Sequence, residues 1–444
     1  MSFRRALGPF DATMVVIGGI IGSGIFKNPA LVAATLDTPG MVLAAWVAGG
    51  AVAIAGAFAY AELGARLPRA GGQYVYLRDA WHPVVGFLYG WALLFMIETG
   101  AIAAVAIVFS QYALKLAGGA PDLQTPLAIL TILVLSAINY VGVKPGSRVL
   151  NLFVVLKVAA LAVIILVAFS GVAAPSWLSA ARSTGPPTSG ALAFGAALIP
   201  ILFAYGGWQN ANYVAEEMRD PRRYLPRSLI LGTLAVVAIY LLVNIAYLRS
   251  LGLDGLALTE TPAADAVGKW LGANGERFVA AAIAISTFGF LDLAVLAPTR
   301  VYYAMAADGA FFPAVGRLHP RFHTPGAAIV LQSVWAILLT LTGRYDDLLN
   351  TVVFADWIFF GLTVGGLFIL RRRMAGNDDG YRTPGYPWLP ALFVTVAMFV
   401  VFSTIRHAPA RSAVGAALLL LGVPSFYLFK RRSITQSPTP PISH

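Results

Sequence analysis

Two glycine-rich stretches interrupt apolar segments of the chain: GGIIGSGI at positions 18–25 and FAYGGWQN at positions 203–210. Each stretch is poorly suited to the interior of a helix, because a glycine there lowers helix stability by about 1 kcal/mol relative to alanine. A membrane helix broken there would leave backbone N–H and C=O groups without partners, which is tolerated only beside other protein or a polar cavity. The two stretches therefore predict two broken membrane helices beside a cavity.

The backbone groups freed at the two breaks could together bind a zwitterion. N–H groups near Ser23 and Gly24 would begin the outer half of the first helix, where the positive end of the helix dipole favours a carboxylate. The freed carbonyls that would suit an ammonium group are those of Ile17, Ile20, Phe203, Ala204 and Gly206. The glycines could instead serve only close helix packing, but two glycine clusters in corresponding spans favour a transporter's substrate site.

Lys157 lies in the apolar run NLFVVLKVAA, too deep in a predicted membrane helix for its ammonium group to reach the surface easily. Ionisable residues at such depth are costly and by default functional. We expect its partners to be carbonyls of the broken first helix and the hydroxyls of Ser286 and Thr287. The lysine would then do permanently what a bound Na⁺ does in a cation-coupled carrier; pairing with a core carboxylate is the alternative.

Three acids also lie inside apolar segments: Glu98, Asp292 and Asp356. Any of them could carry a proton if it were buried, Glu98 first, although an ion pair or a hydrogen bond would explain them equally well. Among the many aromatic residues, Phe203 and Tyr205 lie at the second break itself. There they could act as a gate that covers a bound ligand.

The composition is that of a polytopic membrane protein. Hydrophobic residues make up 58% of the 444 positions and charged residues only 11%, which is too apolar for a soluble fold. The formal charge of +11 comes from Lys and Arg clustered in short loops, which indicates membrane topology rather than binding to nucleic acid. With no cysteine and no HExxH or GxSxG motif, we predict no metal site, no cofactor and no enzyme activity.

Segments of about 20 apolar residues predict an all-α polytopic protein with 12 transmembrane helices. Their limits are Asp11–Ala33, Met41–Arg66, Pro83–Leu114, Pro126–Val143, Val149–Val172, Ala191–Glu216, Pro226–Arg249, Glu276–Ala306, Pro325–Thr342, Leu348–Leu370, Trp388–Ile405 and Ser412–Lys430. The breaks fall in helices 1 and 6, which divides helices 1 to 10 into two inverted five-helix repeats, residues 1–172 and 191–371. Helices 11 and 12, at 388–430, lie outside the repeat.

The distribution of charge predicts the orientation of the helices. Lys and Arg are more frequent on the side of the N-terminus, which predicts that both termini are cytoplasmic. Glu216 and Glu217 end helix 6 on that side, in a charged run with three arginines that we interpret as a solvated or gate-forming ion-pair cluster. No cleavable signal peptide is predicted at the N-terminus, and the polar, proline-rich tail at 433–444 is expected to be disordered.

Three motifs carry a resemblance to a known family: GGIIGSGIF at 18–26, FAYGGWQNANYVAEEMRDPRRYLPRSL at 203–229 and TRVYYAMAADGAFFP at 299–313. In this order, over nearly the whole chain, they resemble the L-amino acid transporter branch of the amino acid–polyamine–organocation superfamily. The resemblance implies a leucine-transporter-type fold, with five plus five inverted helices and two extra ones, that works by alternating access.

The resemblance also implies roles for residues at the two breaks. In such carriers the substrate carboxylate binds backbone amides and the serine of the first break, here Ser23 and Gly24. The substrate amino group meets carbonyls that correspond to Ile20, Phe203 and Gly206, and Phe203 matches the gating aromatic of the family.

Further from the breaks, Lys157 matches a helix 5 lysine of bacterial relatives that takes the place of a structural sodium ion, which implies sodium-independent transport. After the glycine of helix 8, here Gly289, the branch usually has a small residue and an asparagine, whereas this chain has Phe290, Leu291 and Asp292. Phe290 could shrink the side-chain pocket. Some relatives are tethered to a heavy chain through a cysteine; this chain has none, so no disulfide-linked partner is expected.

The leading hypothesis is a sodium-independent carrier of small neutral L-amino acids such as alanine and serine. It would exchange one amino acid for another across a bacterial inner membrane, as a monomer in the lipid bilayer. Exchange follows if the empty carrier reorients slowly and the loaded carrier quickly. A proton-coupled importer that uses a buried acid, or an antiporter of cationic amino acids or polyamines, remains open as an alternative.

Overall fold

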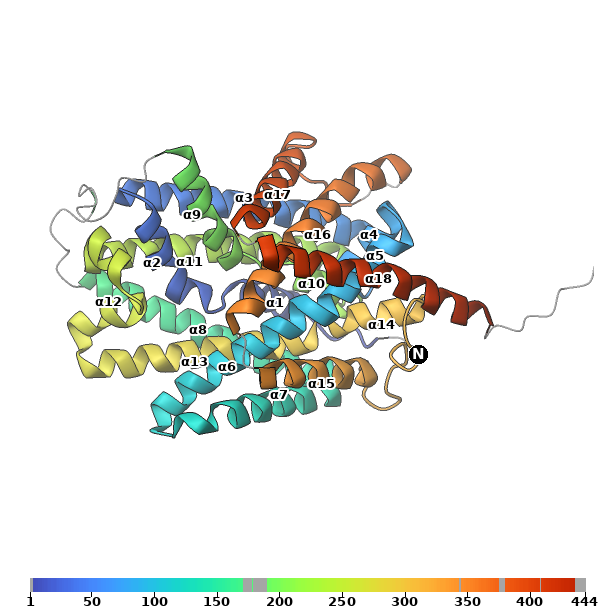
Figure 1. The fold of residues 1–444 in the computed structure, drawn as a ribbon, viewed down its shortest axis with the longest axis horizontal. Helices are drawn as coiled ribbons and strands as arrows, with labels where there is room; N and C mark the ends of the chain where they lie inside the picture. The colour runs from blue at the N-terminus through green and yellow to red at the C-terminus, as the bar shows by residue number, and fades with distance from the viewer. Residues whose placement is uncertain are drawn as a thin grey trace, which may run out of the picture.

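The computed structural model describes residues 3–170, 178, 190–342, 345–374, 380–407 and 409–435. Within these ranges the regular structure is helical, and the only strand-like pairing is a single parallel bridge between Leu7 and Met218. Figure 1 places the N-terminus at one end of the helical bundle, with α2 (Gly24–Thr35) and α12 (Pro262–Leu271) toward the other. We refer to these as the N-terminal end and the opposite end.

The first predicted break is present. Helix α1 (Pro9–Ile20) ends within the glycine-rich stretch, and α2 begins at Gly24 after a bend of 41°. The intervening residues have no α-helical hydrogen bonds to continue α1, apart from Ile21 N–H, which donates to the Ile17 carbonyl. The cluster of glycines thus terminates the helix where the sequence predicts it.

The second predicted break is also present. Helix α9 (Ala191–Ala204) ends at the start of the second glycine-rich stretch, and the chain becomes helical again only in α10 (Asn210–Tyr213) and the 3₁₀ turn η3 (Ala215–Glu217). Gly207 adopts a φ of +111°, a backbone conformation that side chains disfavour. A Cβ atom at Gly207 would collide with the carbonyl of Gly19, and one at Gly19 with the carbonyl of Gly207, so the two breaks meet backbone to backbone.

Helix is present in every one of the twelve predicted segments. Besides α1, α2, α9 and α10, the helices that fill them are α3 (Pro39–Arg66), α5 (Pro83–Ala92), the π-helix η1 (Leu93–Ile97), α6 (Glu98–Ala117), α7 (Gln124–Val141), α8 (Val143–Ser170), α11 (Pro221–Leu258), α13 (Ala273–Leu296), α14 (Thr299–Ala307), α15 (Gly326–Thr342), α16 (Tyr345–Arg373), α17 (Trp388–His407) and α18 (Pro409–Thr435). Two short helices lie where the sequence predicts loops: α4 (Gln73–Ala80) and α12.

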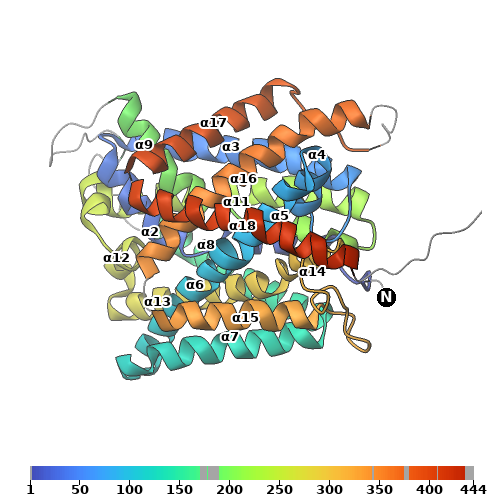
Figure 2. The same ribbon diagram turned by 45° about the vertical axis from the view of Figure 1, so that its right-hand side comes forward.

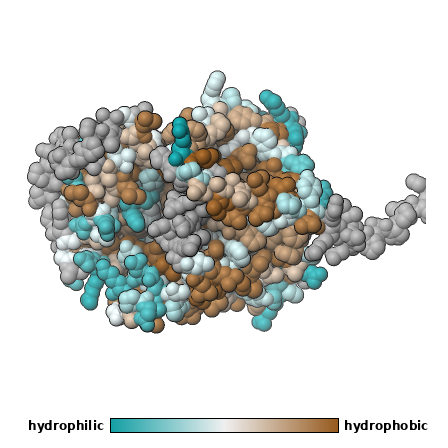
Figure 3. Space-filling model, viewed as in Figure 1, coloured by the Kyte–Doolittle hydropathy of each residue, from teal (hydrophilic) through white to brown (hydrophobic). Residues whose placement is uncertain are grey.

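The helices have the length and composition of membrane spans. In the described part of the chain, eight helices are long and apolar enough to cross a membrane, or nine if the bent pair α1–α2 is one span. Figure 3 shows hydrophobic residues over a broad area of one face, with hydrophilic residues toward its margins. The chain is therefore a multi-pass membrane protein.

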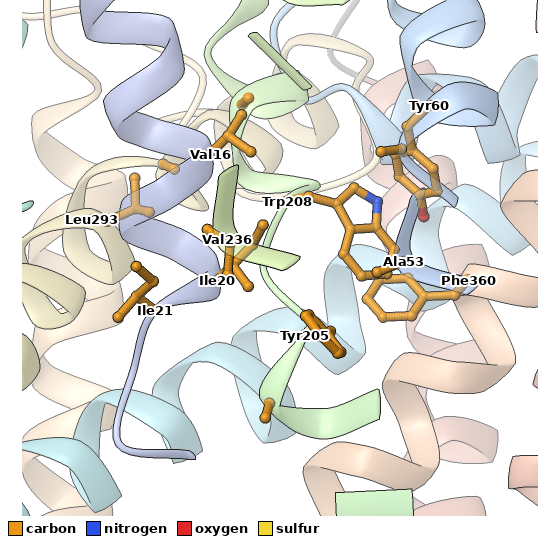
Figure 4. Packing of buried hydrophobic residues seen from close by; sticks show 14 of the residues in the cluster. Val16, Ile20, Ile21, Ala53, Tyr60, Tyr205, Trp208, Val236, Leu293 and Phe360 are labelled. Carbon is orange, nitrogen blue, oxygen red and sulfur yellow. The ribbon is translucent and has the colours of Figure 1, made fainter. Parts of the chain in front are cut away.

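The two broken helices lie in the interior of this bundle. Helix α11 packs against α1, α2, α3 and α8, and α13 packs against α6 and α8; Figures 1 and 2 both place α7 and α15 side by side at the periphery. Figure 4 shows Val16 and Ile20 of α1, and Ile21 directly after it, packed among Val236 of α11 and Leu293 of α13. This packing fixes the first break against its neighbours.

Candidate functional site

A cavity of about 120 Å³ lies between the two helix breaks. Seven of the residues predicted to bind substrate line it: Ile20, Ser23, Gly24, Phe203, Ala204, Gly206 and Phe290. Ile17 does not line it, and its carbonyl accepts the Ile21 N–H. The two glycine-rich stretches, nearly 200 positions apart in the sequence, thus form walls of one space. Backbone N–H and C=O groups that a continuous helix would consume lie beside that space, as the broken helices require.

The other walls of the cavity come from unbroken helices. Ile97, Glu98, Ala101 and Val105 line it from the end of η1 and from α6, while α16 contributes Asp356, Trp357 and Phe360. The wall also includes Gln209 and Asn210, which directly follow the second break. The position of these two polar residues in the sequence could have identified them, whereas nothing in the sequence singles out Trp357 or Phe360 beyond their closeness to Asp356.

Lys157 is fully buried on α8 and holds the end of α1. Its ammonium group donates to the carbonyl oxygens of Gly18, at 2.9 Å, and Ile21, at 2.6 Å. The expected carbonyl partners from the broken helix are therefore present. The contact gives α1 an internal positive charge at the point where its helical hydrogen bonding stops, which the negative end of the helix dipole favours.

The two hydroxyls predicted beside Lys157 bond elsewhere. Ser286 Oγ lies 3.4 Å from the Gly22 carbonyl, which it can donate to across the first break. Thr287 Oγ1 donates within its own helix, to the carbonyls of Ile283 and Ala284. Neither hydroxyl has a hydrogen bond to Lys157 in the described part of the chain, and Ser286 instead supports the broken segment.

Tyr240 of α11 joins the two breaks and was not predicted from the sequence. Its hydroxyl lies 3.0 Å from the Ile20 carbonyl and 3.2 Å from the Ala204 carbonyl. One hydroxyl hydrogen can serve one carbonyl at a time, so the last carbonyls of α1 and α9 share this donor. A tyrosine inside a long apolar helix gives no sequence signal for such a role.

The three buried acids fall into different environments. Glu98 and Asp356 line the cavity, from α6 and α16. Asp292 lies outside the cavity lining, is fully buried, and accepts a hydrogen bond of 2.7 Å from Asn139 Nδ2 of α7. The interpretation of Asp292 as a hydrogen-bonded core residue is the one that fits this geometry.

The two aromatics at the second break also differ. Phe203 is 37% exposed and lines the cavity, where it can cover a ligand. Tyr205 is fully buried, donates to the Trp46 carbonyl at 3.3 Å, and packs against the rings of Trp46 and Tyr240. Figure 4 shows it inside the packed core, so the prediction that Tyr205 covers the ligand is wrong.

Toward the N-terminal end of the bundle, residues that follow the second break are bound to other elements. Glu217 forms a buried ion pair with Arg300 of α14, at 2.6 Å from Nε to Oε1. The Glu217 carbonyl also accepts N–H groups of Ala6 and Leu7, at 2.9 and 3.0 Å. Of the two interpretations of this cluster, solvated or ion-paired, the ion pair is the one that Glu217 fits, but its partner comes from another helix and not from the neighbouring arginines.

At the opposite end a second cavity, of about 390 Å³, adjoins the first. Ser23 lines both cavities. The second cavity is lined mainly by α2, α6, α12 and α13, and its charged residues are Lys27, Lys115, Glu260 and Glu276. The space between the breaks is thus bordered by a polar vestibule at one end and by packed side chains at the other.

Comparison with known proteins identifies the family. The chain matches the amino acid permease family over residues 7–424. The chain belongs to this family. The permease is 32% identical over 432 residues to a serine/threonine exchanger of Bacillus subtilis, an alignment that covers 97% of this chain and 98% of the exchanger.

Human relatives of the permease are similar over most of their length too. It is 30% identical over 440 residues to the human b(0,+)-type amino acid transporter 1 and 29% identical over 433 residues to the human cystine/glutamate transporter. These alignments cover 96% and 97% of this chain and 88% and 86% of the relatives. The permease is therefore a transporter of amino acids and not an enzyme.

Proposed function

We propose that this permease exchanges small neutral L-amino acids, such as serine and alanine, across a bacterial inner membrane by a sodium-independent, alternating-access mechanism. The observation that carries the proposal is the cavity of about 120 Å³ between two helix breaks whose backbone N–H and C=O groups suit a zwitterion. The similarity to a bacterial serine/threonine exchanger over 97% of the chain supports it.

In this proposal the backbone of the substrate binds at the two breaks. The carboxylate accepts N–H groups of Ser23 and Gly24 at the start of α2, and the ammonium group donates to carbonyls of Ile20, Phe203 and Gly206. A cavity of about 150 Å³ accommodates benzene, so about 120 Å³ suits an amino acid of about six to eight heavy atoms. Phe290 and Phe203 limit the space on two sides, which favours small side chains.

Sodium independence rests on Lys157. A sodium ion that supports a broken helix is coordinated by its free carbonyls, and here the ammonium group of Lys157 donates to two of them. The positive charge is covalently part of the protein, so no ion need accompany the substrate.

The architecture in this proposal is that of twelve transmembrane helices with an inverted five-plus-five repeat. The two breaks lie in the first and sixth of the twelve predicted spans, so each unit has five spans, and this odd number inverts the second unit relative to the first. Both termini lie in the cytoplasm in this proposal, which the higher frequency of Lys and Arg on the side of the N-terminus supports. The protein functions as a monomer without a disulfide-linked partner.

This orientation assigns a conformational state. The end closed by Glu217 and Arg300 faces the cytoplasm, and the end with the vestibule faces outward, so the substrate cavity is accessible from outside. Inward opening then requires the Glu217–Arg300 pair and the contact between Leu7 and Met218 to separate. The two states differ in which end is packed, as alternating access requires.

A second candidate, proton-coupled import, is favoured by one observation. Glu98 and Asp356 both border the cavity, and a carboxylate there could bind a proton from one side and release it on the other. Asp292 is not part of this alternative, because it is hydrogen-bonded outside the cavity.

Uptake into sodium-free liposomes distinguishes the two candidates. Purified permease takes up labelled serine, alanine or leucine into vesicles that contain unlabelled serine or are empty. Exchange predicts uptake that requires internal serine, ignores an imposed pH gradient and is faster for serine and alanine than for leucine. Uptake into empty vesicles driven by an inward proton gradient would contradict exchange and establish proton coupling.

A further inference from the structure

Two carboxylates in the substrate cavity have no protein partner to neutralise them. Glu98 stands at the start of α6, directly after the π-helix η1, and Asp356 stands on α16. Both line the cavity, and Glu98 is only 6% exposed. Across the described residues, neither carboxylate takes part in a hydrogen bond or an ion pair. Buried acids of this kind need a counter-charge or a proton.

The walls of the cavity supply no such charge. The residues that line it include no Lys, Arg or His, and Lys157 is bound to carbonyls of α1. The groups in electrostatic range of Glu98 are Asp356 and the hydroxyls of Tyr213 and Tyr302, none of them a cation. The two carboxyl groups are therefore neutralised either by protons or by a positive charge on the molecule that occupies the cavity.

The two acids stand where the side chain of a substrate would lie. The breaks that hold the backbone of the substrate belong to α1–α2 and α9–α10, whereas Glu98 and Asp356 belong to α6 and α16, which pack against each other. Trp357 and Phe360 line the cavity from the same helix as Asp356. Aromatic faces attract ammonium groups, so the chemistry of this wall is that of a site for a cation.

We propose that Glu98 and Asp356 form a side-chain subsite for an ammonium group, so that the permease also carries short diamino acids such as 2,4-diaminobutyrate. The inference rests on the proposed function, because it assumes that the substrate backbone binds at the two breaks. The cavity of about 120 Å³ favours a short diamino acid over lysine. A neutral amino acid in the same place leaves the two acids to be neutralised by protons.

A matched pair of ligands tests the subsite. 2,4-Diaminobutyrate and homoserine have the same chain length, and they differ by an ammonium group in place of a hydroxyl. Each is added outside serine-loaded liposomes as an inhibitor of labelled serine uptake, and each is tested for its ability to drive labelled serine out. We expect diaminobutyrate to inhibit at a lower concentration than homoserine and to drive efflux.

Substitution of either acid should weaken this preference. In Glu98→Gln and in Asp356→Asn, the inhibition constant of diaminobutyrate divided by that of homoserine should rise by about tenfold or more. This is the loss of affinity expected for one charge-assisted hydrogen bond. Asp122→Asn, at an exposed acid before α7, should leave the ratio as it is. The ratio is read in variants that still exchange serine, which shows that they are folded.

The outcomes separate the subsite from the proposed function. Serine exchange in the wild type without inhibition or efflux by diaminobutyrate would overturn the subsite and leave the proposed function standing. A ratio that is unchanged in both variants would also overturn it. If the wild type does not exchange serine, the proposed function fails, and the subsite is then tested by thermal stabilisation of the purified protein. The subsite requires that diaminobutyrate stabilises the wild type more than homoserine does. It also requires that neither variant shows this difference.

Discussion

The ammonium group of Lys157 lies where α1 ends, within hydrogen-bond distance of two carbonyls that the helix itself no longer uses. Removing a lysine from water costs several kcal/mol, and here the cost is offset by carbonyls that would otherwise lack a donor. Tyr240 provides a comparable contact for Ile20 and Ala204. At the scale of residues, the broken helices are therefore stabilised by side chains that come from unbroken ones.

Replacing Lys157 with alanine should reduce exchange at least about tenfold, since each buried carbonyl left without a donor costs about 1–3 kcal/mol. The measurement is trans-stimulated serine uptake in sodium-free liposomes. Lys144→Ala, at an exposed lysine near the start of the same helix, is the matched control and should behave as the wild type. Exchange near the wild-type rate in Lys157→Ala would show that the broken helix does not need this cation.

Contact between the two breaks sets the shape of the site at the scale of elements. Gly19 and Gly207 approach so closely that neither has room for a Cβ atom. The stretch after α9 can pass the end of α1 only because both residues are glycines. This contact couples the position of α1 to that of α9 and α10, which border the same cavity.

Gly207→Ala should therefore lower the rate of exchange by more than tenfold, because the new methyl group meets the carbonyl of Gly19 and the φ of +111° disfavours a side chain. Gly268→Ala, in α12, is the control, since nothing lies within 4 Å of a Cβ atom there. Exchange rates and melting temperatures of both variants are compared with the wild type. Equal exchange in Gly207→Ala would mean that the breaks need not touch during transport.

Much of this arrangement could be predicted from the sequence, because it depends on local backbone chemistry. The glycine clusters predict both breaks, and Lys157 predicts a contact with the broken helix. Arg300, Tyr240 and Trp357 could not be found in this way: each lies inside a helix, and its role depends on which distant helix it faces. Tyr205 lies at the second break, two residues after Phe203, yet its side chain is buried in the core while that of Phe203 lines the cavity, and the sequence does not show into which side each ring turns at a helix end.

At the scale of the whole molecule, the closed end and the vestibule determine from which side of the membrane the cavity is accessible. The chain contains no cysteine, so single cysteines can be introduced without removing any. Lys27→Cys places a thiol at an exposed position of the second cavity, and Arg4→Cys places one at the N-terminal end. These two thiols report on opposite ends of the bundle.

With both termini cytoplasmic, a membrane-impermeant maleimide should label Lys27→Cys in intact cells and should label Arg4→Cys only after the membrane is permeabilised. The reason is that the vestibule faces outward in this orientation. Labelled protein is measured by its shift on a gel. The opposite pattern would reverse the topology and make the structure an inward-facing state.

A structure of the permease with bound serine tests the central claim most directly, because that claim is the location of the substrate between the two breaks. The account predicts serine in the cavity of α1–α2 and α9–α10, with its carboxylate on the N–H groups of Ser23 and Gly24 and its ammonium group on carbonyls at the ends of α1 and α9. Serine bound elsewhere, or bound without contact to either break, would contradict it.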